Sequence, residues 1–249
     1  MSESRKYKNP PAIEVLCEIH FSETESNLTL FGDFYQQIKD KYPEQKQLNQ
    51  VGFEMDFSQE AIQARQLNSG AMMRFSSSDS SRLVQITQSL LTVNKLKPYL
   101  GYESFKEDVA ENLQVYLNLS KPKYFERVGM RYIDRILIPE DDFGLEKYFN
   151  FSLDFANSEF STINGISFRV QLTPKHSDHI LLVTLNSVIS KEEGNSEFIL
   201  DMYDTFALQK EIDKNHLLTI LDEAHENTEL VFEAVITDAA RNLFDEEKK

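Results

Sequence analysis

Residues 125–139 read FERVGMRYIDRILIP and lie near the midpoint of the chain. In an extended strand, successive side chains point to opposite faces of the sheet. The stretch then has one apolar face and one basic face, and the basic face carries Arg127, Arg131 and Arg135. A helix would also gather these arginines on one side, but the β-branched and aromatic residues favour a strand, which Pro139 ends. We therefore predict a strand at the centre of the fold.

Apolar residues on both sides of this strand follow strand-like and helix-like patterns. Before it, the patterns predict a strand at 12–21, a helix at 30–42, strands at 51–57, 71–76, 82–88 and 90–96, and a helix at 102–119. After it, they predict a helical turn at 144–149, strands at 151–155, 165–173, 179–189 and 197–206, and a long helix at 213–244.

Both halves of the chain therefore have the order strand, helix, several strands, helix. Because the strands follow one another instead of alternating with helices, this order favours an α+β fold with a mostly antiparallel sheet or sheets. We interpret residues 1–120 and 121–249 as two similar lobes, the second with a long C-terminal helix, and leave one continuous domain open. An internal duplication would explain the repeated order.

Composition limits the class of protein. The 249 residues are 41% hydrophobic and carry a formal charge of −15, which disfavours broad contact with nucleic-acid phosphates and favours a basic protein partner. No apolar run approaches the roughly 20 residues that cross a bilayer, and the N-terminal residues lack the apolar core of a signal peptide. Cys17 is the single cysteine, which fits a reducing cytoplasm and, on an apolar strand face, a place in the core.

The row of Arg127, Arg131 and Arg135 has two interpretations. Successive arginines on this strand lie about 13 Å apart, which is too wide for one small phosphate but still permits a phosphate backbone, another anion or an acidic partner. Alternatively, the arginines are paired with acidic neighbours within this acidic chain. If the first strands of the two halves are adjacent, Glu14 and Glu18 face the row, and this is the interpretation that the charge favours.

Other candidate residues favour structural roles. Asp134 falls on the apolar face of the arginine strand near Tyr132, and we interpret it as a hydrogen-bonded structural carboxylate. Asp201 and Asp204 are three residues apart, so a strand places them on opposite faces. His176 and His179 lie beside a turn with Asp178, but a metal site needs further ligands, so we predict no metal and no cofactor. The sequence has neither a phosphate-binding glycine loop nor a nucleophile elbow.

The predicted C-terminal helix is the best candidate for a partner surface. Its apolar sector is broad for a helix that lies on one sheet, and it includes Leu221, His225, Thr228 and Phe232. Two interpretations are open. The helix packs on its own sheet, or the far edge of its apolar sector contacts a second copy in a homodimer.

Three stretches are short motifs: residues 9–15 (NPPAIEV), residues 127–136 (RVGMRYIDRI), and a C-terminal segment with His225, Phe232, Ile236, Thr237, Arg241 and Phe244. On these motifs, the chain resembles a sporadically distributed family of uncharacterised bacterial proteins. The resemblance implies a cytoplasmic accessory protein, since some members lie near phage-defence genes. A small dimeric CRISPR-linked accessory that assists an effector nuclease is one role that it implies, and the family supplies no catalytic residues.

These observations lead to hypotheses of different classes. The first is a non-enzymatic interaction protein, homodimeric, that binds a larger and more basic protein or nucleoprotein, such as an effector nuclease–RNA complex. The alternative is an enzyme or sensor that holds a nucleotide or other phosphorylated ligand with Arg127, Arg131 and Arg135. Direct nucleic-acid binding is disfavoured by the negative charge.

Overall fold

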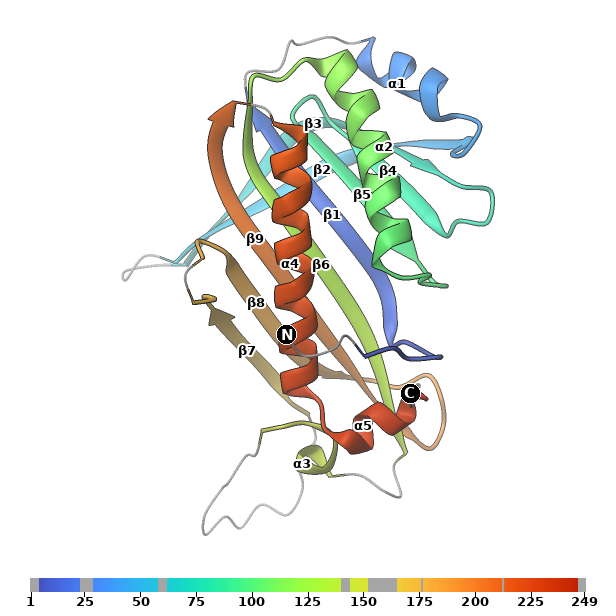
Figure 1. Ribbon diagram of the computed structural model, residues 1–249, viewed down its shortest axis with the longest axis vertical. Coiled ribbons are helices and arrows are strands. Elements are labelled where there is room, and N and C mark those ends of the chain that lie inside the picture. Colours follow the sequence, from blue (N-terminus) through green and yellow to red (C-terminus); the bar gives the residue numbers. More distant parts are fainter. Residues whose placement is uncertain are drawn as a thin grey trace.

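The computed structural model describes residues 5–22, 29–57, 62–139, 144–151, 165–175, 177–211 and 213–245. These residues form one nine-stranded sheet with helices packed on one of its faces (Figure 1). The α+β class and the antiparallel sheet are therefore confirmed.

The sheet has the strand order β2-β3-β4-β5-β1-β6-β9-β8-β7, and all neighbours are antiparallel. The strands are β1 (Ala12–Ser22), β2 (Glu44–Phe57), β3 (Ile62–Ser76), β4 (Arg82–Ile86), β5 (Leu90–Leu96), β6 (Tyr124–Pro139), β7 (Ser167–Leu172), β8 (Ile180–Val188) and β9 (Asn195–Glu211). In each half, the first strand pairs with the last strand of that half, and the β1–β6 pair joins the halves. Since both halves share one continuous sheet, separate lobes are not confirmed.

The helices are α1 (Leu30–Ile38), α2 (Tyr102–Ser120), α3 (Leu145–Tyr148), α4 (Lys214–Val235) and α5 (Asp238–Leu243). α4 packs on β6 and β9, while α2 packs on β5 and against α1. Figure 1 shows α1, α2 and α4 on the same side of the sheet, which we call the helix face. The opposite side of the sheet is called the open face.

The core lies between the helix face and the helices. The apolar residues of the central strand, Val128, Met130, Ile136 and Ile138, are buried there, as the alternation predicts. Cys17 is also buried in this core, and burial raises the pKa of its thiol. Each large apolar side chain buried in this way contributes about 1.5–3 kcal/mol relative to exposure.

Gly129 lets the ring of Tyr203 lie close to the backbone of β6 on the open face. A Cβ atom at this position would lie 2.7 Å from Cε2 of Tyr203, a β9 side chain that covers the glycine. The Arg131 guanidinium carbon lies 5.9 Å from the centre of the same ring. The glycine between the first two arginines of the row therefore leaves room for an aromatic ring.

Several predicted boundaries were wrong. The helix predicted at 213–244 is two helices, because Ile236 is extended and bridges to Phe149, and the Thr237 hydroxyl then accepts from the Ala240 amide to begin α5. β2 begins at Glu44 and not at residue 51, β3 is one strand from Ile62 where a strand was predicted only from residue 71, and α1 ends before residue 42. The first residues of β2, before residue 51, are mostly polar, so hydrophobic periodicity did not reveal this part of the strand. Most of the strand predicted at 151–155 lies outside the described residues.

Candidate functional site

The arginine row lies on the open face and is paired within the chain. The contacts are Arg127 Nη2 to Glu18 at 3.4 Å, Arg131 to both oxygens of Asp201 at 2.7 and 2.5 Å, and Arg135 to Glu192 at 3.0 Å and Glu197 at 2.8 Å. The hydrogen bonds that Arg131 donates to Asp201 raise the pKa of Arg131. The structure therefore shows the pairing that the acidic composition favours.

The predicted partners of the row are correct in part. β1 and β6 are adjacent, and Glu18 lies within ion-pair distance of Arg127. Glu14 accepts a hydrogen bond from the Asn94 side-chain amide at 2.6 Å, and its charge helps to raise the pKa of Arg131, as expected for a residue that faces the row. The neighbouring strand β9 supplies Asp201 to Arg131 because it brings this residue to the open face, beside Ile133.

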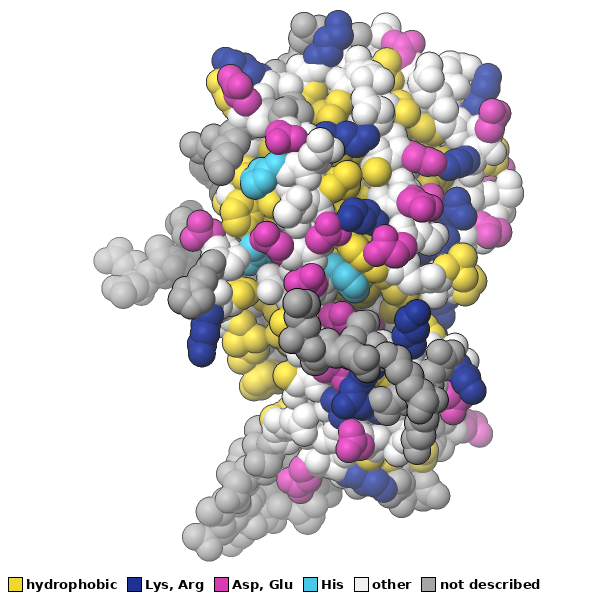
Figure 2. Space-filling view, in the orientation of Figure 1, with side chains coloured by type: hydrophobic (Ala, Val, Ile, Leu, Met, Phe, Trp, Pro, Cys, Tyr) yellow, Lys and Arg dark blue, Asp and Glu magenta, His cyan; other side chains and the backbone are white. Residues whose placement is uncertain are grey.

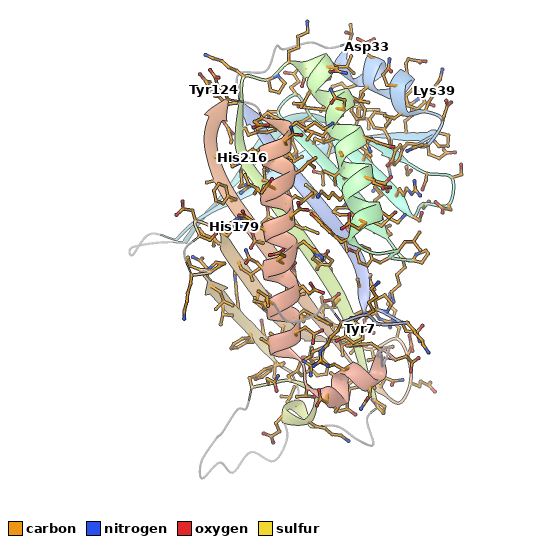
Figure 3. The ribbon with its side chains drawn as sticks, viewed as in Figure 1. Tyr7, Asp33, Lys39, Tyr124, His179 and His216 are labelled. Carbon is orange, nitrogen blue, oxygen red and sulfur yellow. The ribbon has the colours of Figure 1, made fainter. Side chains whose placement is uncertain are left out.

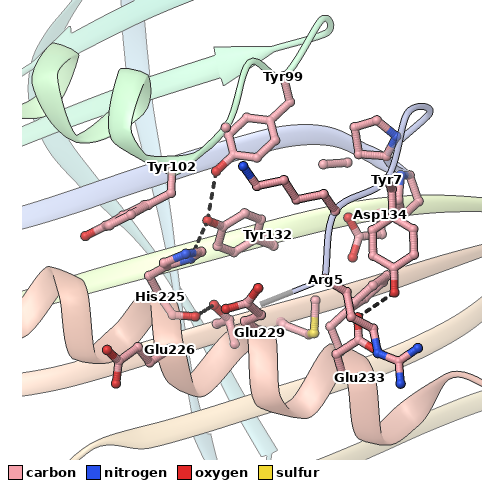
Figure 4. A pocket seen from close by; sticks show the side chains of 18 of the residues that line it. Arg5, Tyr7, Tyr99, Tyr102, Tyr132, Asp134, His225, Glu226, Glu229 and Glu233 are labelled. Atoms are coloured by element: carbon pink, nitrogen blue, oxygen red, sulfur yellow. Dashed lines mark hydrogen bonds and ion pairs between the residues drawn. The ribbon is translucent and has the colours of Figure 1, made fainter. Parts of the chain in front are cut away.

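A second site lies on the helix face, where the N-terminal segment and the loop before α2 meet α4 (Figure 4). It is a hollow of about 960 Å³. We call it the tyrosine hollow and define it by Tyr7, Tyr99, Tyr102, Tyr132, Asp134 and His225. Tyr132 and Asp134 come from the same strand as the arginines, but alternation turns them to the opposite face.

Three side chains of the hollow form a hydrogen-bonded chain. The Tyr99 and Tyr132 hydroxyls are 3.0 Å apart, and the Tyr132 hydroxyl lies 2.9 Å from Nδ1 of His225. Burial lowers the pKa of His225, which favours a neutral ring whose Nδ1 accepts from Tyr132. Burial also raises the pKa of Tyr99 to about 12 and raises the pKa of Tyr132 well above its ordinary value, so both remain hydroxyl donors at neutral pH.

The rim of the hollow joins both α2 and the N-terminal segment to α4. Tyr102 stacks on His225 with ring centres 3.9 Å apart and donates to Asp222 at 2.7 Å. At the other end, Tyr7 donates to Glu233 at 2.5 Å. Figure 3 shows Tyr7 close to the end of α4 that precedes α5. These contacts hold the aromatic walls in place.

Asp134 lies inside the hollow and is only 3% exposed. Among the described residues, none forms a hydrogen bond or an ion pair with its carboxyl group. Burial raises the pKa of Asp134 to about 7, the charge of Asp201 adds to the effect, and Lys97 opposes it. The predicted apolar face was right for this residue, but the predicted hydrogen-bonded role was wrong, because its neighbours across the sheet are Ala12 and Leu200.

A different buried cluster surrounds His179. Its Nδ1 donates to Asp204 at 2.5 Å, and its Nε2 lies 3.2 Å from Glu223. The Asn227 side-chain amide donates to the second oxygen of Asp204 at 3.0 Å. His179 is thus a buried ion-pair residue under α4 and not part of an exposed turn site with Asp178 (Figure 3). Asp201 and Asp204 do lie on opposite faces, as predicted.

The four residues of the predicted partner helix lie toward the chain's own interior. Leu221 and Thr228 are buried residues of α4, and the Thr228 hydroxyl donates to the carbonyl groups of Ala224 and His225. His225 lines the tyrosine hollow, and Phe232 contacts the rings of Tyr7 and Phe244. The broad apolar sector of α4 is therefore covered by the sheet, the N-terminal segment and the end of the chain's own α5 region, so contacts within the chain account for all four residues.

Sequence reasoning did not identify Tyr99 and Tyr102 as site residues. Tyr99 lies between β5 and α2 and Tyr102 is the first residue of α2, and aromatic residues also occur at such places for packing alone. Pro10 and Pro11, Tyr132 and His225 belong to the three motifs that carry the family resemblance, and all line the tyrosine hollow. Segments far apart in the sequence therefore meet at one place, which only the folded chain reveals.

The described part of the chain shows neither a metal-ion cluster nor a membrane-spanning helix. There, no group of three or more His, Cys, Asp or Glu side chains is placed to hold a metal ion, and His176 lies outside the described residues. Of the helices that can be described, none has the length and apolar character to cross a membrane.

No protein-family model matches the chain, and no curated protein is significantly similar to it. The family resemblance of the three motifs therefore stays a prediction.

Proposed function

We propose that this protein is a non-enzymatic accessory protein that binds a larger, more basic protein or nucleoprotein. The setting implied by the sequence resemblance is bacterial phage defence, with an effector nuclease–RNA complex as the partner. The single observation that carries the binding proposal is the acidic layer on the helix face. It belongs to helices that are already fixed on the sheet, so a partner meets a preformed surface.

The acidic layer is formed mainly by α4. This helix carries one lysine, Lys214, against five carboxylates, which are Asp222, Glu223, Glu226, Glu229 and Glu233. On α2, Glu103 and Glu107 are exposed and extend the layer. Figure 2 shows Asp and Glu side chains gathered along α4. A surface of one charge sign speeds the encounter with a partner of the opposite sign, and salt weakens this effect.

The alternative, a nucleotide or phosphate site at the arginine row, has less support. Arg127, Arg131 and Arg135 each have a carboxylate within ion-pair distance. A phosphorylated ligand would have to displace these carboxylates before it could pair with the guanidinium groups. A phosphate site needs uncompensated positive charge, whereas carboxylates neutralise the arginine row on the open face.

The binding proposal is tested by charge reversal on the acidic layer. Tagged protein is used to recover partners from its host at several salt concentrations, with the wild type compared with Glu107→Lys/Glu226→Lys. The matched control is Glu146→Lys/Glu193→Lys, which makes the same charge change at exposed positions away from α2 and α4. We expect the first variant alone to lose a basic partner, and recovery from the wild type to fall as salt rises. A partner retained equally by all three proteins would contradict the proposal.

We also propose that the protein is a homodimer, with its contact at the β7 edge of the sheet. Among the described residues, Phe168 and Leu172 of β7 and Ile180 and Val188 of β8 are exposed apolar side chains. Figure 2 shows hydrophobic side chains gathered at this edge. An edge strand also presents unpaired backbone groups that a second copy can extend.

Light scattering of the purified protein tests the dimer. The expected mass is twice the chain mass of 28.9 kDa, and Phe168→Glu/Leu172→Glu should reduce it to one chain. Leu100→Glu, at another exposed apolar position, is the control. A wild-type mass of one chain at micromolar concentration would contradict the dimer.

A further inference from the structure

Asp134 has no hydrogen-bond or ion-pair partner among the described residues, and the positive charge of Lys97 only partly offsets the burial of its carboxyl group. It is 3% exposed, its neighbours across the sheet are Ala12 and Leu200, and none of the described residues hydrogen-bonds to it. A buried carboxylate is unfavourable unless it is paired or protonated. Because its side chain lines the tyrosine hollow, a partner for the charge can reach it from the hollow (Figure 4).

The walls near Asp134 are aromatic. Tyr99 and Tyr132 pack edge to face, with ring centres 5.9 Å apart and an angle of 88° between the rings. Their hydroxyl groups are already engaged with each other and with His225. An organic cation can pack against the remaining surface of these rings, because the negative face of an aromatic ring attracts positive charge.

The charge of the rim has the same sign as that of Asp134. Six carboxyl groups line the hollow against four basic side chains, and the carboxyl groups belong to Glu103, Asp134, Asp222, Glu226, Glu229 and Glu233. Two of the basic groups are engaged locally: Lys106 donates to Asp222 at 2.8 Å, and Arg5 lies 3.6 Å from Glu233. The hollow therefore favours cations over anions.

We propose that the tyrosine hollow binds an organic cation whose alkylammonium or guanidinium group pairs with Asp134 and lies against the rings of Tyr99 and Tyr132. Two sources carry this chemistry: a free amine or guanidine, and a lysine or arginine side chain of a protein. The site does not suit a divalent metal ion, because one carboxylate among aromatic rings supplies too few oxygen ligands. The site stands independently of the proposed function, although a protein side chain in it would join the two.

Titration calorimetry on the full chain at low salt and mildly alkaline pH tests the cation site. The probes are spermidine, agmatine and a short acetylated Lys-Gly peptide, with 1,4-butanediol as an uncharged probe. We expect the wild type to bind at least one cationic probe and not the diol. Asp134→Asn keeps the size of the side chain but removes its charge, and it should weaken that binding by at least about tenfold.

Two further variants separate the site from the general charge of the protein. Glu146→Gln removes one charge from an exposed position outside the hollow and away from α2 and α4, and it should change the affinity by less than about twofold. Tyr99→Leu removes one aromatic wall from a loop position and should weaken binding by about threefold or more. If Asp134→Asn does not fold, the comparison of Tyr99→Leu with the exposed-charge control still tests the cation site.

The outcomes also distinguish the two sources of the cation. Binding of spermidine or agmatine assigns the hollow to a free organic cation, and binding of the peptide alone assigns it to a protein side chain. The proposal is overturned if no cationic probe binds the wild type, or if Asp134→Asn and Tyr99→Leu bind as well as Glu146→Gln does. Such a failure would leave the charge-reversal test of partner binding unaffected.

Discussion

Asp134 and Asp204 are buried aspartates on adjacent strands of the same sheet face, yet their surroundings are opposite. Asp204, fully buried on β9, accepts hydrogen bonds from His179 at 2.5 Å and from Asn227 at 3.0 Å. Asp134, on β6, accepts none from the described residues and faces a hollow. Both positions hold the same side chain, so the difference lies in what the neighbouring elements supply.

Asp204 is a structural carboxylate, whereas Asp134 is the carboxylate that we propose pairs with a ligand. Around Asp204, α4 supplies Asn227 and the residue before β8 is His179, and together these side chains satisfy both carboxyl oxygens. Around Asp134, the N-terminal segment and α4 leave space instead of donors. Sites that break the rule that buried polar groups are paired are often functional ones, because the unpaired state costs stability.

The largest expected effect is at Asp204. Asp204→Ala leaves the His179 ring buried without its main acceptor and the Asn227 amide without its partner. Breaking a buried ion pair in this way costs about 3–5 kcal/mol in the free energy of unfolding. Urea denaturation of both proteins measures the difference, and Glu193→Ala, at an exposed position, is the control that should be near zero. A loss under about 1 kcal/mol would remove the contrast with Asp134.

The effect at Asp134 should have the opposite sign. Its folded pKa of about 7 lies above the ordinary value of 3.8, so between these pH values the folded chain binds more protons than the unfolded chain. The contribution of Asp134 to stability therefore falls as pH rises, by about 1.4 kcal/mol per pH unit at most, and is constant above pH 7. Asp134→Asn should then be more stable than the wild type, increasingly so from pH 5 to pH 7.

Denaturation curves of the wild type and Asp134→Asn at several pH values test this sign. A variant that is less stable than the wild type at neutral pH would mean that the Asp134 carboxylate has a stabilising partner. Such a result would place Asp134 with Asp204 as a structural residue and would break the comparison.

A third aspartate, Asp201 on the open face, should give a smaller effect. Its bidentate pair with Arg131 is partly exposed to solvent, so Arg131→Ala should cost only about 1 kcal/mol of stability and leave the fold intact. The same variant leaves Asp201 without its cation, which should raise the pKa of Asp134 further through the charge of Asp201. Titration of the Asp134 carboxyl by NMR measures that change, and an unchanged or lower pKa would show that the two faces are not coupled.

The sequence predicted some of this arrangement and not the rest. Alternation in residues 125–139 correctly placed the arginines on one face and Asp134 on the other. The same alternation, applied to the later strand, correctly placed Asp201 and Asp204 on opposite faces. Periodicity assigns a residue to a face, but it does not show which side chains lie across the sheet or above it. For this reason, the pairing of His179 with Asp204 and the lack of a partner for Asp134 were both missed.

The tyrosine hollow was beyond sequence reasoning for a related reason. Its walls come from the N-terminal segment, the loop before α2, β6 and α4, which are brought together only by the β1–β6 pair and the packing of α4. Tyr99 and His225 are separated by 126 positions in the chain and are joined through Tyr132. No local pattern records a contact of that range, whereas the short motifs did include several lining residues.

The smallest expected effect sharpens the account of the Asp204 region. Burial alone would lower the pKa of His179, but the hydrogen bonds and charges of Asp204 and Glu223 outweigh burial and raise it. Stability from the charged ring is therefore fully present below the ordinary pKa of 6.5 and is lost as pH rises through the raised folded value. The Glu223 side chain is 54% exposed, so Glu223→Gln should cost less than about 0.5 kcal/mol, and mainly at acidic pH. A cost comparable with that of Asp204→Ala would show that the exposed carboxylate, and not the buried one, holds His179 in place.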